Sequence, residues 1–484
     1  MSCGLMWFRE DLRIRDNTAL SAACHENREV LACYLIDKTM WKKHDIAACR
    51  VEFILRNLAA LQTELAQKNI RLLIIELSNP KQTVPLLDYL INEYKIDTLY
   101  FNDQYEVDEL TRDKHVIASL KIPVVNFTDQ VIFAPKELLT LSRTPYTIFT
   151  PYKNSFIKAV LQRGGITPLK TIVAGATMLP ALKLNRNWQT QGVILYPTVP
   201  QHLAGFNSTI SATYWPAGET AAQQRLQQFI KTKISDYQLA RDFPAQQGTS
   251  KLSAYLASGI LSSRQCFAAA IKANKDKLQG GDPNLDCWIS ELIWREFYKQ
   301  ILANFPRIAK HKAFKLETEK WPWRHDKNLL HAWQTAQTGY PLIDAAMRQL
   351  QQTGWMHNRL RMVVAMFFTK DCFLDWRWGE KFFMQHLVDG DLAANNGGWQ
   401  WAASTGCDAA PYFRVFNPVR QSERFDPEGL FIKTYCPELK DVPPKKLHDP
   451  YKLPGNINYP KPIVDYRLTR AMVIDTIKKY TKSL

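Results

Sequence analysis

The stretch "VEFILRNLAALQTELAQKNIRLLIIEL", residues 51–77, changes its hydrophobic period part-way along and decides the fold of the first part of the chain. Up to residue 69 the apolar side chains recur at helical spacing, which places Ile54, Leu58, Leu61 and Leu65 on one face. From residue 70 the run "IRLLIIEL" is short and continuously apolar, as in a buried strand. A helix that leads directly into a buried strand predicts one unit of a parallel α/β sheet.

The same alternation continues on both sides of this stretch. Further short apolar runs, separated by helical stretches, occupy residues 3–8, 30–36, 96–101 and 122–127. We therefore predict a doubly wound parallel-sheet α/β domain over residues 1–130. GxGxxG does not follow the first of these strands, so the usual dinucleotide-binding fingerprint is absent.

The texture of the sequence changes after residue 130. Prolines interrupt weakly periodic sequence from 131 to 215, which predicts a long connector over the surface. From 216 to 484 helical periodicity dominates, so we predict a large all-α domain there. More than one domain is also expected from the length of 484 residues, because single cores stop growing at roughly 250–300 residues.

Composition narrows the class of protein. The net charge of +16 favours a polyanionic partner, usually nucleic acid, although a merely basic soluble surface is the alternative. The nine cysteines include no CxxC pair, which predicts reduced thiols and neither disulfides nor a zinc site. Charges come too early in the N-terminal sequence for a signal peptide, and no apolar run reaches the ~18 residues of a membrane span. We expect a cytoplasmic protein.

Tryptophan is concentrated in the second half of the chain. Ten of the 14 tryptophans lie between Trp288 and Trp401. Indoles of this kind commonly fill a large helical core. Their clustering also suits a site that stacks planar rings, either of a cofactor or of nucleobases.

Two motifs carry polar groups that have alternative explanations. "GTSKLS", residues 248–253, offers hydroxyls beside the unpaired amides of a helix start, which suits either a phosphate site or a plain N-cap. In "WISELIWREFY", residues 288–298, Glu291, Trp294 and Tyr298 can share one helix face. Glu291 is then either a hydrogen-bonding group of a site or a surface partner of Arg295.

The segment "DGDLAANNGGWQWAAST", residues 389–405, combines acids, amides, glycines and indoles. Its two acids can bind ribose hydroxyls or the charges of Arg359 and Arg361, which need acidic partners in a buried helix. Asn395 can place an amide against a ring nitrogen, and the glycines at 397 and 398 allow close backbone approach to a flat ligand. Together these features favour a large aromatic cofactor, whereas His357 alone is better explained as structural.

Several of these motifs resemble the photolyase/cryptochrome family, and most closely its bacterial class I cyclobutane pyrimidine dimer photolyases. The resemblance covers essentially the whole chain. It rests on "MWFREDLRIRDN" (6–17), "GTSKLS", "ELIWREFY" (291–298), "TGYPLIDAAMRQL" (338–350) and "DGDLAANNGGWQWAASTGCDAAPYFRVFNP" (389–418).

The resemblance implies that the helical domain binds FAD. It places Arg361 and Asp389 in a salt bridge beside the flavin, with Asn395 facing the flavin N5 atom. Relatives often carry arginine where this chain has Lys251. The implied contacts to the cofactor phosphates are Tyr237, Thr249, Ser250, Lys251, Leu252 and Ser253, and those to the flavin are Trp288, Asn358, Arg361, Asp389, Gly390, Asp391 and Asn395.

The resemblance also implies a reaction, the light-driven splitting of cyclobutane pyrimidine dimers by one electron from excited reduced FAD. Trp399, Trp376 and Trp323 match a tryptophan relay that reduces the flavin, with Trp321 and Trp378 as alternative endpoints. Glu291 would stabilise the dimer radical anion, so the implied catalytic set is Glu291, Asn395 and the three relay tryptophans. The implied DNA contacts are Arg241, Glu291, Trp294, Arg295, Tyr298, Asn358, Arg359, Met362, Trp401 and Gln421.

An antenna chromophore is implied near "YFNDQYEVDELTRD", residues 100–113. Glu109 matches a pterin contact, Asp108 replaces the usual asparagine, and Lys310 matches a contact to a folate tail. Methenyltetrahydrofolate is the favoured antenna, with a deazaflavin or no antenna as alternatives. We expect a monomer whose partner is dimer-containing DNA, and neither a metal nor a membrane.

Two rivals share the fold that the resemblance implies. Plant-type signalling cryptochromes usually carry an acid opposite N5 and animal types a cysteine, whereas this chain has Asn395. (6-4) photoproduct photolyases place histidines where this chain has Asn358 and Met362. A flavoenzyme that does not use light has no supporting motif.

Overall fold

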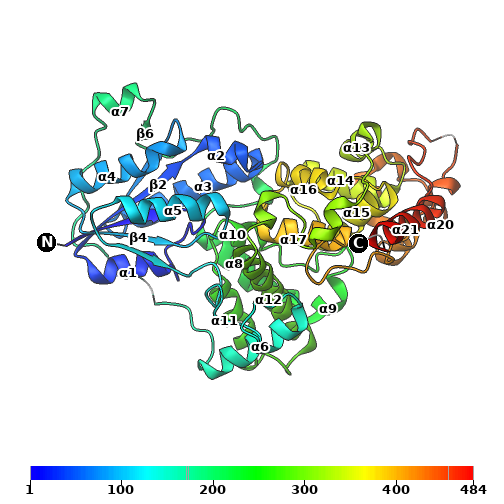
Figure 1. The fold of residues 1–484 in the computed structure, drawn as a ribbon, viewed down its shortest axis with the longest axis horizontal. Coiled ribbons are helices and arrows are strands. Elements are labelled where there is room, and N and C mark those ends of the chain that lie inside the picture. Colours follow the sequence, from blue (N-terminus) through cyan, green and yellow to red (C-terminus); the bar gives the residue numbers. More distant parts are fainter. Residues whose placement is uncertain (1, 171, 173, 456, 483–484) are drawn as a thin grey trace.

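The computed structural model describes residues 2–170, 172, 174–455 and 457–482. Its N-terminal part is a six-stranded sheet in the order β5-β4-β1-β2-β3-β6, flanked by helices (Figure 1). All pairings among the first five strands are parallel. The strands are β1 (Cys3–Phe8), β2 (Glu29–Ile36), β3 (Arg71–Glu76), β4 (Thr98–Asn102), β5 (Val124–Phe127) and β6 (Ile194–Tyr196).

Alternate residues of β1 enter two different cores, as a doubly wound sheet requires. Met6 and Phe8 pack with helices α1 (Thr18–Glu26) and α3 (Ala48–Ala66). Leu5 and Trp7 pack with α4 (Thr83–Tyr94) and α5 (Val107–Ser119). The predicted α/β domain is therefore confirmed, including the helix and strand of the stretch 51–77.

The connector differs from its prediction because it contains regular structure. It holds α6 (Phe149–Gln162) and the short α7 (Arg186–Thr190), and it returns to the sheet as β6. β6 pairs antiparallel with β3, so one edge of the sheet is not parallel. Three residues next to several prolines carry too little period-2 pattern to reveal such an edge strand.

The remainder of the chain is helical, with its last named strand at β6 in the part that the structure describes. The helices are α8 (Glu219–Thr232), α9 (Tyr237–Ala240), α10 (Ser253–Ala257), α11 (Ser263–Ala273), α12 (Pro283–Asn304), α13 (Lys327–Gln334), α14 (Pro341–Thr353), α15 (Asn358–Met366), α16 (Trp376–Met384), α17 (Leu392–Ala403), α18 (Pro418–Phe425), α19 (Leu430–Tyr435), α20 (Pro444–Leu447) and α21 (Tyr466–Lys482). The short α2 (Lys38–Lys43) lies in the sheet domain.

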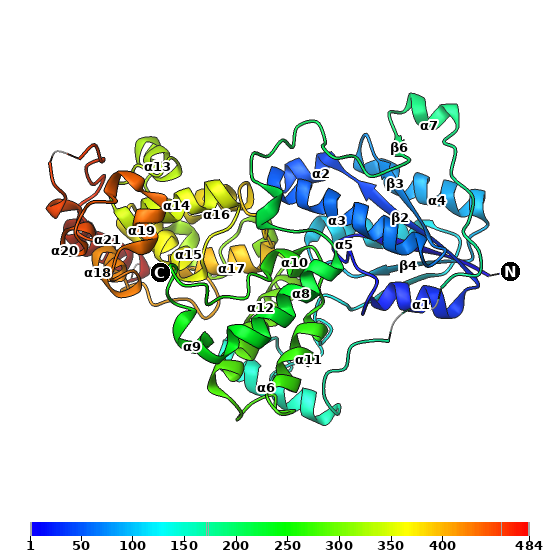
Figure 2. The same cartoon turned by 180° about the vertical axis from the view of Figure 1, so that it is seen from behind.

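The two domains share one hydrophobic core and a buried ion network. Side chains of α8, α11 and α12 pack in the same cluster as α1 and α3, and the two views agree that α8, α10 and α12 adjoin the sheet domain (Figures 1 and 2). Arg264 donates to both Asp16 and Asp129, and Arg13 also pairs with Asp129. These buried pairs fix the position of the helical domain against the loops that follow β1 and β5.

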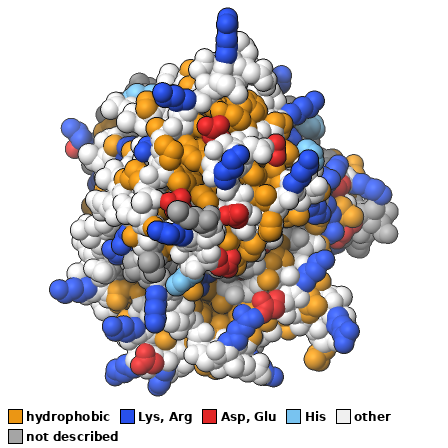
Figure 3. Space-filling model, turned by 90° about the vertical axis from the view of Figure 1, so that its left-hand side faces the viewer, with side chains coloured by type: hydrophobic (Ala, Val, Ile, Leu, Met, Phe, Trp, Pro, Cys, Tyr) orange, Lys and Arg blue, Asp and Glu red, His pale blue; other side chains and the backbone are white. Residues whose placement is uncertain are grey.

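The described residues bear on the membrane, metal and disulfide expectations. Within them, no helix is long and apolar enough to cross a membrane, and no three His, Cys, Asp or Glu side chains are placed to bind a metal. All nine cysteines are free. At the sheet end of the molecule, basic side chains are interspersed with acidic and apolar ones (Figure 3).

Candidate flavin and DNA site

A buried salt bridge joins α15 to the turn before α17. Arg361 Nη2 donates to both carboxylate oxygens of Asp389, at 2.8 and 3.0 Å, and its Nε donates to the Met356 carbonyl at 2.8 Å. The Asp389 side chain is 2% exposed and that of Arg361 25% exposed. One guanidinium nitrogen thus bridges both carboxylate oxygens, and these charge-assisted bonds, together with the Nε bond, fix the orientation of the Arg361 side chain. The expected Arg361–Asp389 bridge is confirmed.

The other acid and arginine pair differently from the prediction. Asp391 accepts from Ala394 N as the N-cap of α17 and pairs with the buried Lys299 of α12 at 2.9 Å. Although burial opposes its ionisation, Lys299 and Arg295 hold the pKa of Asp391 far below the usual range. Arg359 pairs instead with Asp242 at 2.8 Å. Asp391 is thus an acid of the α12–α17 contact, and not the partner of Arg359.

Asn395 lies one turn into α17 and is nearly buried. Its Nδ2 donates to the Glu380 carbonyl of α16 at 2.9 Å, which fixes the orientation of the amide. The two glycines that follow have different roles. A Cβ at Gly397 would meet the Tyr298 ring at 2.3 Å, whereas a Cβ at Gly398 would meet nothing within 4 Å. Gly397 therefore permits helix packing, so the prediction that both glycines serve ligand approach was wrong for Gly397.

The "GTSKLS" loop does not cap its helix. α10 begins at Ser253 without a side-chain cap bond, and the Ser253 hydroxyl accepts from Trp355 Nε1 at 3.2 Å. Lys251 adopts a left-handed conformation, with φ 51°. Burial, together with Lys233 and Arg225, lowers the pKa of Lys251. Three cations that repel one another around a loop with free hydroxyls fit an anionic ligand such as a diphosphate, so the plain N-cap explanation is wrong.

Aromatic side chains from α9 and α12 pack on the same ring of α8. Tyr237 of α9 contacts Phe229 of α8 at 5.5 Å between ring centroids, and Trp288 of α12 contacts the same ring at 5.0 Å. Both predicted cofactor residues are buried. Burial raises the pKa of Tyr237 far above its usual value, so its hydroxyl stays protonated and can donate.

His357 has the structural role predicted for it. Its Nδ1 accepts from Arg359 N at 3.3 Å, which makes it the N-cap of α15. Burial, reinforced by Arg359 and Arg361, lowers its pKa to about 4, so the imidazole is neutral at neutral pH. The cap places Asn358 at the first turn, where its side chain is exposed.

A second group of predicted residues lies on the outward face of α12. Glu291 accepts from Arg241 Nη1 at 2.7 Å, and the same nitrogen lies 3.1 Å from Cys287 Sγ. Both side chains are part-exposed, at 32% and 20%. Glu291 is therefore not a partner of Arg295, the alternative considered from sequence. Arg295 donates to the Gln130 carbonyl at 2.8 Å and to Ser263, contacts within the protein, and its binding to DNA stays a prediction.

Trp294 stacks face to face on Phe149, with ring centroids 3.6 Å apart and planes 7° from parallel. Tyr298 packs beside it at 5.6 Å. One face of the half-buried indole is therefore already covered by α6, a helix from the predicted connector. The remaining predicted DNA residues, Met362, Trp401 and Gln421, are all half-buried.

The three predicted relay tryptophans are all buried, at 2% exposure for Trp399, 0% for Trp376 and 7% for Trp323. Trp399 projects from α17 over Gly379 of α16, where a Cβ would meet its ring at 2.1 Å. Trp376 begins α16, and Trp323 contacts Trp321 and Phe373. Of the suggested endpoints, Trp378 is half-buried and Trp321 is 7% exposed.

A cavity of about 610 Å³ lies at the carboxyl ends of the strands. It is lined from the loops after β1, β2, β3 and β4, where open α/β sheets bind ligands. Asp108 and Glu109 both line it, and Asp108 pairs with Lys43 and His44 at 2.6 and 2.9 Å. Burial and the nearby Glu106 raise the pKa of Glu109 to about 7. Lys310 is exposed and does not line this cavity, and its contact to a folate tail stays a prediction.

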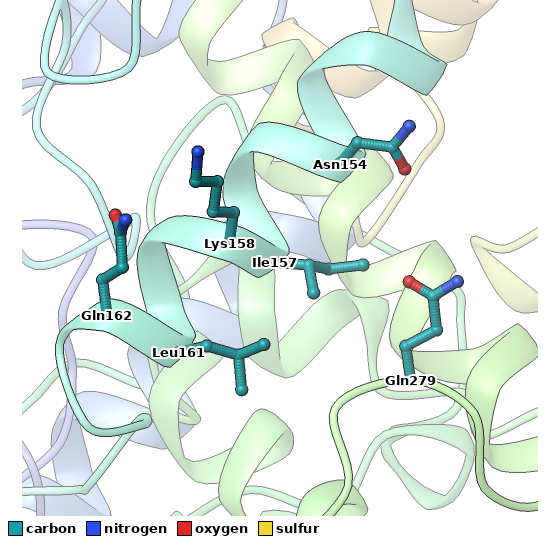
Figure 4. Close-up of a pocket in the computed structure, with 6 residues that line it drawn as sticks. All are labelled: Asn154, Ile157, Lys158, Leu161, Gln162 and Gln279. Atoms are coloured by element: carbon teal, nitrogen blue, oxygen red, sulfur yellow. The ribbon is translucent and has the colours of Figure 1, made fainter.

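A second hollow, of about 490 Å³, lies between α6 and the loop at Gln279. Ile157 and Leu161 point toward that loop, and Lys158 is the one charged lining residue (Figure 4). It contains none of the predicted site residues.

The geometry agrees with comparisons with known proteins. Residues 4–171 match the family model of DNA photolyase, and residues 288–479 match the FAD binding domain of DNA photolyase. The chain is 42% identical, over 99% of its length and 98% of the relative, to a deoxyribodipyrimidine photo-lyase of Salmonella typhimurium. The chain belongs to the DNA photolyase family.

Solved structures of photolyase relatives agree in fold. A bacterial class III photolyase from Agrobacterium tumefaciens matches with a TM-score of 0.85 at 31% identity, covering 100% of this chain and 98% of that one. A cryptochrome from Synechocystis sp. PCC6803 matches with a TM-score of 0.84 at 26% identity, covering 98% and 99%. The fold alone therefore does not separate photolyases from cryptochromes.

The helical part of this photolyase-family chain is an FAD-binding domain. Its residues fit the cofactor on three independent observations: the uncompensated cations at Lys251, the open space beside Gly398, and the fixed amide of Asn395. The sequence did not reveal Lys299, Asp242 and Phe149. These residues are distant in the chain from the site residues that they contact, which are Asp391, Arg359 and Trp294 respectively. A buried arginine or aspartate requires a partner of opposite charge, so the sequence could indicate that Arg359 and Asp391 have such partners, but not which residues they are.

Proposed function

We propose that this protein repairs DNA by splitting cyclobutane pyrimidine dimers in a light-driven reaction. The observation that carries the proposal is the 42% identity to a deoxyribodipyrimidine photo-lyase over nearly the whole chain. The Arg361–Asp389 bridge and the fixed amide of Asn395 support it. When bound, FAD supplies the electron that opens the cyclobutane ring. The protein's own side chains would bind FAD, bind the flipped dimer and stabilise the charge that develops on it.

The cofactor-binding residues would hold FAD and orient its flavin ring. Lys251 with the hydroxyls of Thr249 and Ser250 would bind the diphosphate, since backbone amides and cations suit phosphate oxygens. Arg361, fixed by Asp389, would lie beside the isoalloxazine and offer it a positive charge. Asn395, held by the Glu380 carbonyl, would present a neutral amide to N5.

The outward face of α12 would receive the dimer after it leaves the helix, as other enzymes that act on bases require. When a base edge replaces Arg241 beside it, Glu291 in its protonated form would donate a hydrogen bond to the atom where negative charge develops, an arrangement that stabilises a transient anion. Trp294 and Trp401 would contact the dimer rings, with Asn358 and Met362 on the opposite side. Arg241, Arg359 and Gln421 would bind the DNA backbone.

Repair is favoured over signalling by two observations. Curated relatives at 34–42% identity are deoxyribodipyrimidine photo-lyases, whereas the cryptochrome matches at 26%. Asn395, Asn358 and Met362 stand where cryptochromes and (6-4) enzymes of the expected types would differ. The protein is further proposed to act as a cytoplasmic monomer.

The cavity at the sheet edge is proposed to hold an antenna chromophore, with methenyltetrahydrofolate favoured. Its volume of about 610 Å³ suits a small aromatic ligand. Asp108 is already paired with Lys43 and His44, so it would contribute less to such a ligand than a free asparagine. Glu109 supplies a buried carboxyl oxygen without a hydrogen-bond partner.

The decisive experiment illuminates the purified, FAD-loaded protein with an oligonucleotide that contains one thymine dimer. Restored thymines in the light and intact dimers in a dark control are the expected result. An FAD-loaded, reduced protein that binds the oligonucleotide but restores no thymines in light would overturn the repair function in favour of signalling.

A further inference from the structure

An extra indole lies beside the predicted end of the tryptophan relay. Trp321 follows the short helical turn η5 (Leu316–Lys320), and its ring centroid lies 5.7 Å from that of Trp323, with planes at 57°. The two indoles are equally buried, each 7% exposed. Within the described part of the chain, the other ring in contact with Trp323 is Phe373, at 5.1 Å. Trp321 is thus in direct ring contact with Trp323, whereas the described ring contact of Trp378 is with His325.

A buried lysine lies over the same indole. Lys370 is 0% exposed and belongs to the π-helix η6 (Phe367–Asp371), which directly follows α15. Its Nζ is 5.4 Å from the centroid of Trp321 and donates to the Ala403 carbonyl at 3.2 Å and the Ser404 hydroxyl at 2.9 Å. The lysine therefore lies between Trp321 and the C-terminal end of α17, the helix that carries Trp399.

The charge of Lys370 has little compensation from its neighbours. Within the described residues, no ion pair between Lys370 and a carboxylate is found, and burial raises the pKa of the adjacent Asp371 well above its usual value, which weakens its negative charge. Two cations act in this region, Lys315 before η5 on Lys370 and Arg470 of α21 on Asp371, while Asp326 and Arg324 act on the next residue, Cys372. Burial, with Lys315, lowers the pKa of Lys370 to about 7.

We propose that Trp321 is a fourth indole of the electron relay, reached from Trp323, and that the Lys370 ammonium controls whether the positive charge reaches it. In this step Trp321 gives one electron to the Trp323 radical cation. Trp323 becomes neutral, Trp321 becomes the radical cation, and no bond or proton moves. The ultimate oxidant is excited oxidised FAD, acting through Trp399 and Trp376. The inference rests on the proposed function.

Electrostatics gives the direction of control. A positive ammonium over the Trp321 ring stabilises the neutral indole and opposes its radical cation, because like charges in a buried site repel strongly. When Lys370 is charged, the positive charge stays on Trp323. When it is neutral, the charge spreads to Trp321, farther from the site of reduction, and recombination becomes slower.

The experiment records the lifetime of the indole radical after a light flash on the oxidised, FAD-loaded protein, between pH 6 and 9. We compare the wild type with Trp321→Phe, Lys370→Met and Lys370→Arg, and use the exposed neighbour Lys320→Met as the matched control. FAD content and thermal melting of each variant establish that it is folded. This readout differs from repair activity, and a purely structural lysine would not change it.

In the wild type the lifetime should rise about tenfold as the pH passes through about 7. Lys370→Met should give the long lifetime throughout, Lys370→Arg the short one, and Trp321→Phe a short one at every pH. Lys320→Met should behave as the wild type. If Trp321→Phe keeps the wild-type pH response, or Lys370→Met leaves the lifetime unchanged, the proposal is overturned while the relay stands. If the flash produces no indole radical at all, the relay itself is wrong, although light-driven repair by reduced protein would still stand.

Discussion

Removing the Glu291 carboxyl separates catalysis from stability, because this chain offers an ion pair of similar length and exposure elsewhere, with one further bond from Arg348 Nη1 to Glu438 at 3.0 Å. Glu291 pairs with Arg241 at 2.7 Å, with side chains 32% and 20% exposed. Glu438 pairs with Arg348, also at 2.7 Å, with side chains 29% and 19% exposed. Glu438 lies outside the predicted pocket, so Glu438→Ala is a matched control for Glu291→Ala.

Both variants should lose little stability, and Glu438→Ala at least as much as Glu291→Ala. Part-exposed pairs of this kind contribute roughly 0.2–1 kcal/mol. In a helical domain of this size, 1 kcal/mol corresponds to a melting shift of about 2–4 °C. Both proteins should therefore melt within about 4 °C of the wild type and retain FAD.

Only Glu291→Ala should change the reaction with DNA. A missing hydrogen-bond donor aimed at developing charge costs ~2.7–4 kcal/mol in other enzymes. Here electron transfer competes with decay of the excited state, so the loss should appear as several-fold fewer repairs per absorbed photon. Glu291→Gln should recover part of the yield, because its amide can still donate. The freed Arg241 should strengthen binding to undamaged DNA by up to about fivefold.

The assay measures dimer affinity by titration in the dark and repair yield per photon by thymine recovery under calibrated light. Glu438→Ala should match the wild type in both. If Glu291→Ala repairs with the wild-type yield, Glu291 serves only as the counter-ion of Arg241, and its catalytic role is wrong.

Three other outcomes are expected. Trp399→Phe should block photoreduction of the oxidised flavin and leave repair by chemically reduced protein nearly intact, which flash spectroscopy and thymine recovery measure; normal photoreduction would show that the relay runs elsewhere. DNA affinity should fall steeply with salt, by about 0.9 in log K against log salt for each phosphate neutralised on duplex, and a flat response would mean that the +16 charge serves another purpose. The free energy of unfolding should drop by about 3 kcal/mol between pH 6.5 and 4, because His357 takes up a proton at its ordinary pKa in the unfolded state but only at a pKa of about 4 in the folded state. His357→Asn keeps an N-cap that does not titrate, so denaturant unfolding of this variant should show a drop smaller by that amount.

The fold could be predicted where periodicity is strong. The stretch 51–77 does form α3 (Ala48–Ala66) and β3 (Arg71–Glu76), because amphipathic spacing and a short apolar run have few alternatives. β6 could not be predicted, since three residues form a strand only because the edge of β3 is available to pair. α6 was missed because prolines and threonines obscure its first turn, although its apolar face packs against α12.

The site shows a similar division. The need of Arg361 for a buried acid was readable from composition, and Asp389 is that acid. The partner of Arg359 was not readable, because Asp242 lies 117 residues away and equally acidic residues lie nearer in the sequence. Partner choice among like charges depends on tertiary geometry, which spacing along one helix does not contain.

The paired arginines bear on how the protein would distinguish damaged from intact DNA. Arg241 and Arg359 are each held by a carboxylate in the free protein, by Glu291 and Asp242. A phosphate that captures either arginine must leave that carboxylate unpaired, which offsets much of the attraction for ordinary duplex. A flipped dimer removes this cost at Glu291 but not at Asp242, because the dimer's base edge replaces Arg241 as the hydrogen-bonding partner of Glu291. We therefore expect Asp242→Asn to strengthen binding to intact and damaged DNA alike, and Glu291→Gln to strengthen binding to intact DNA while reducing the preference for the dimer. Equal effects of the two substitutions on that preference would refute this account.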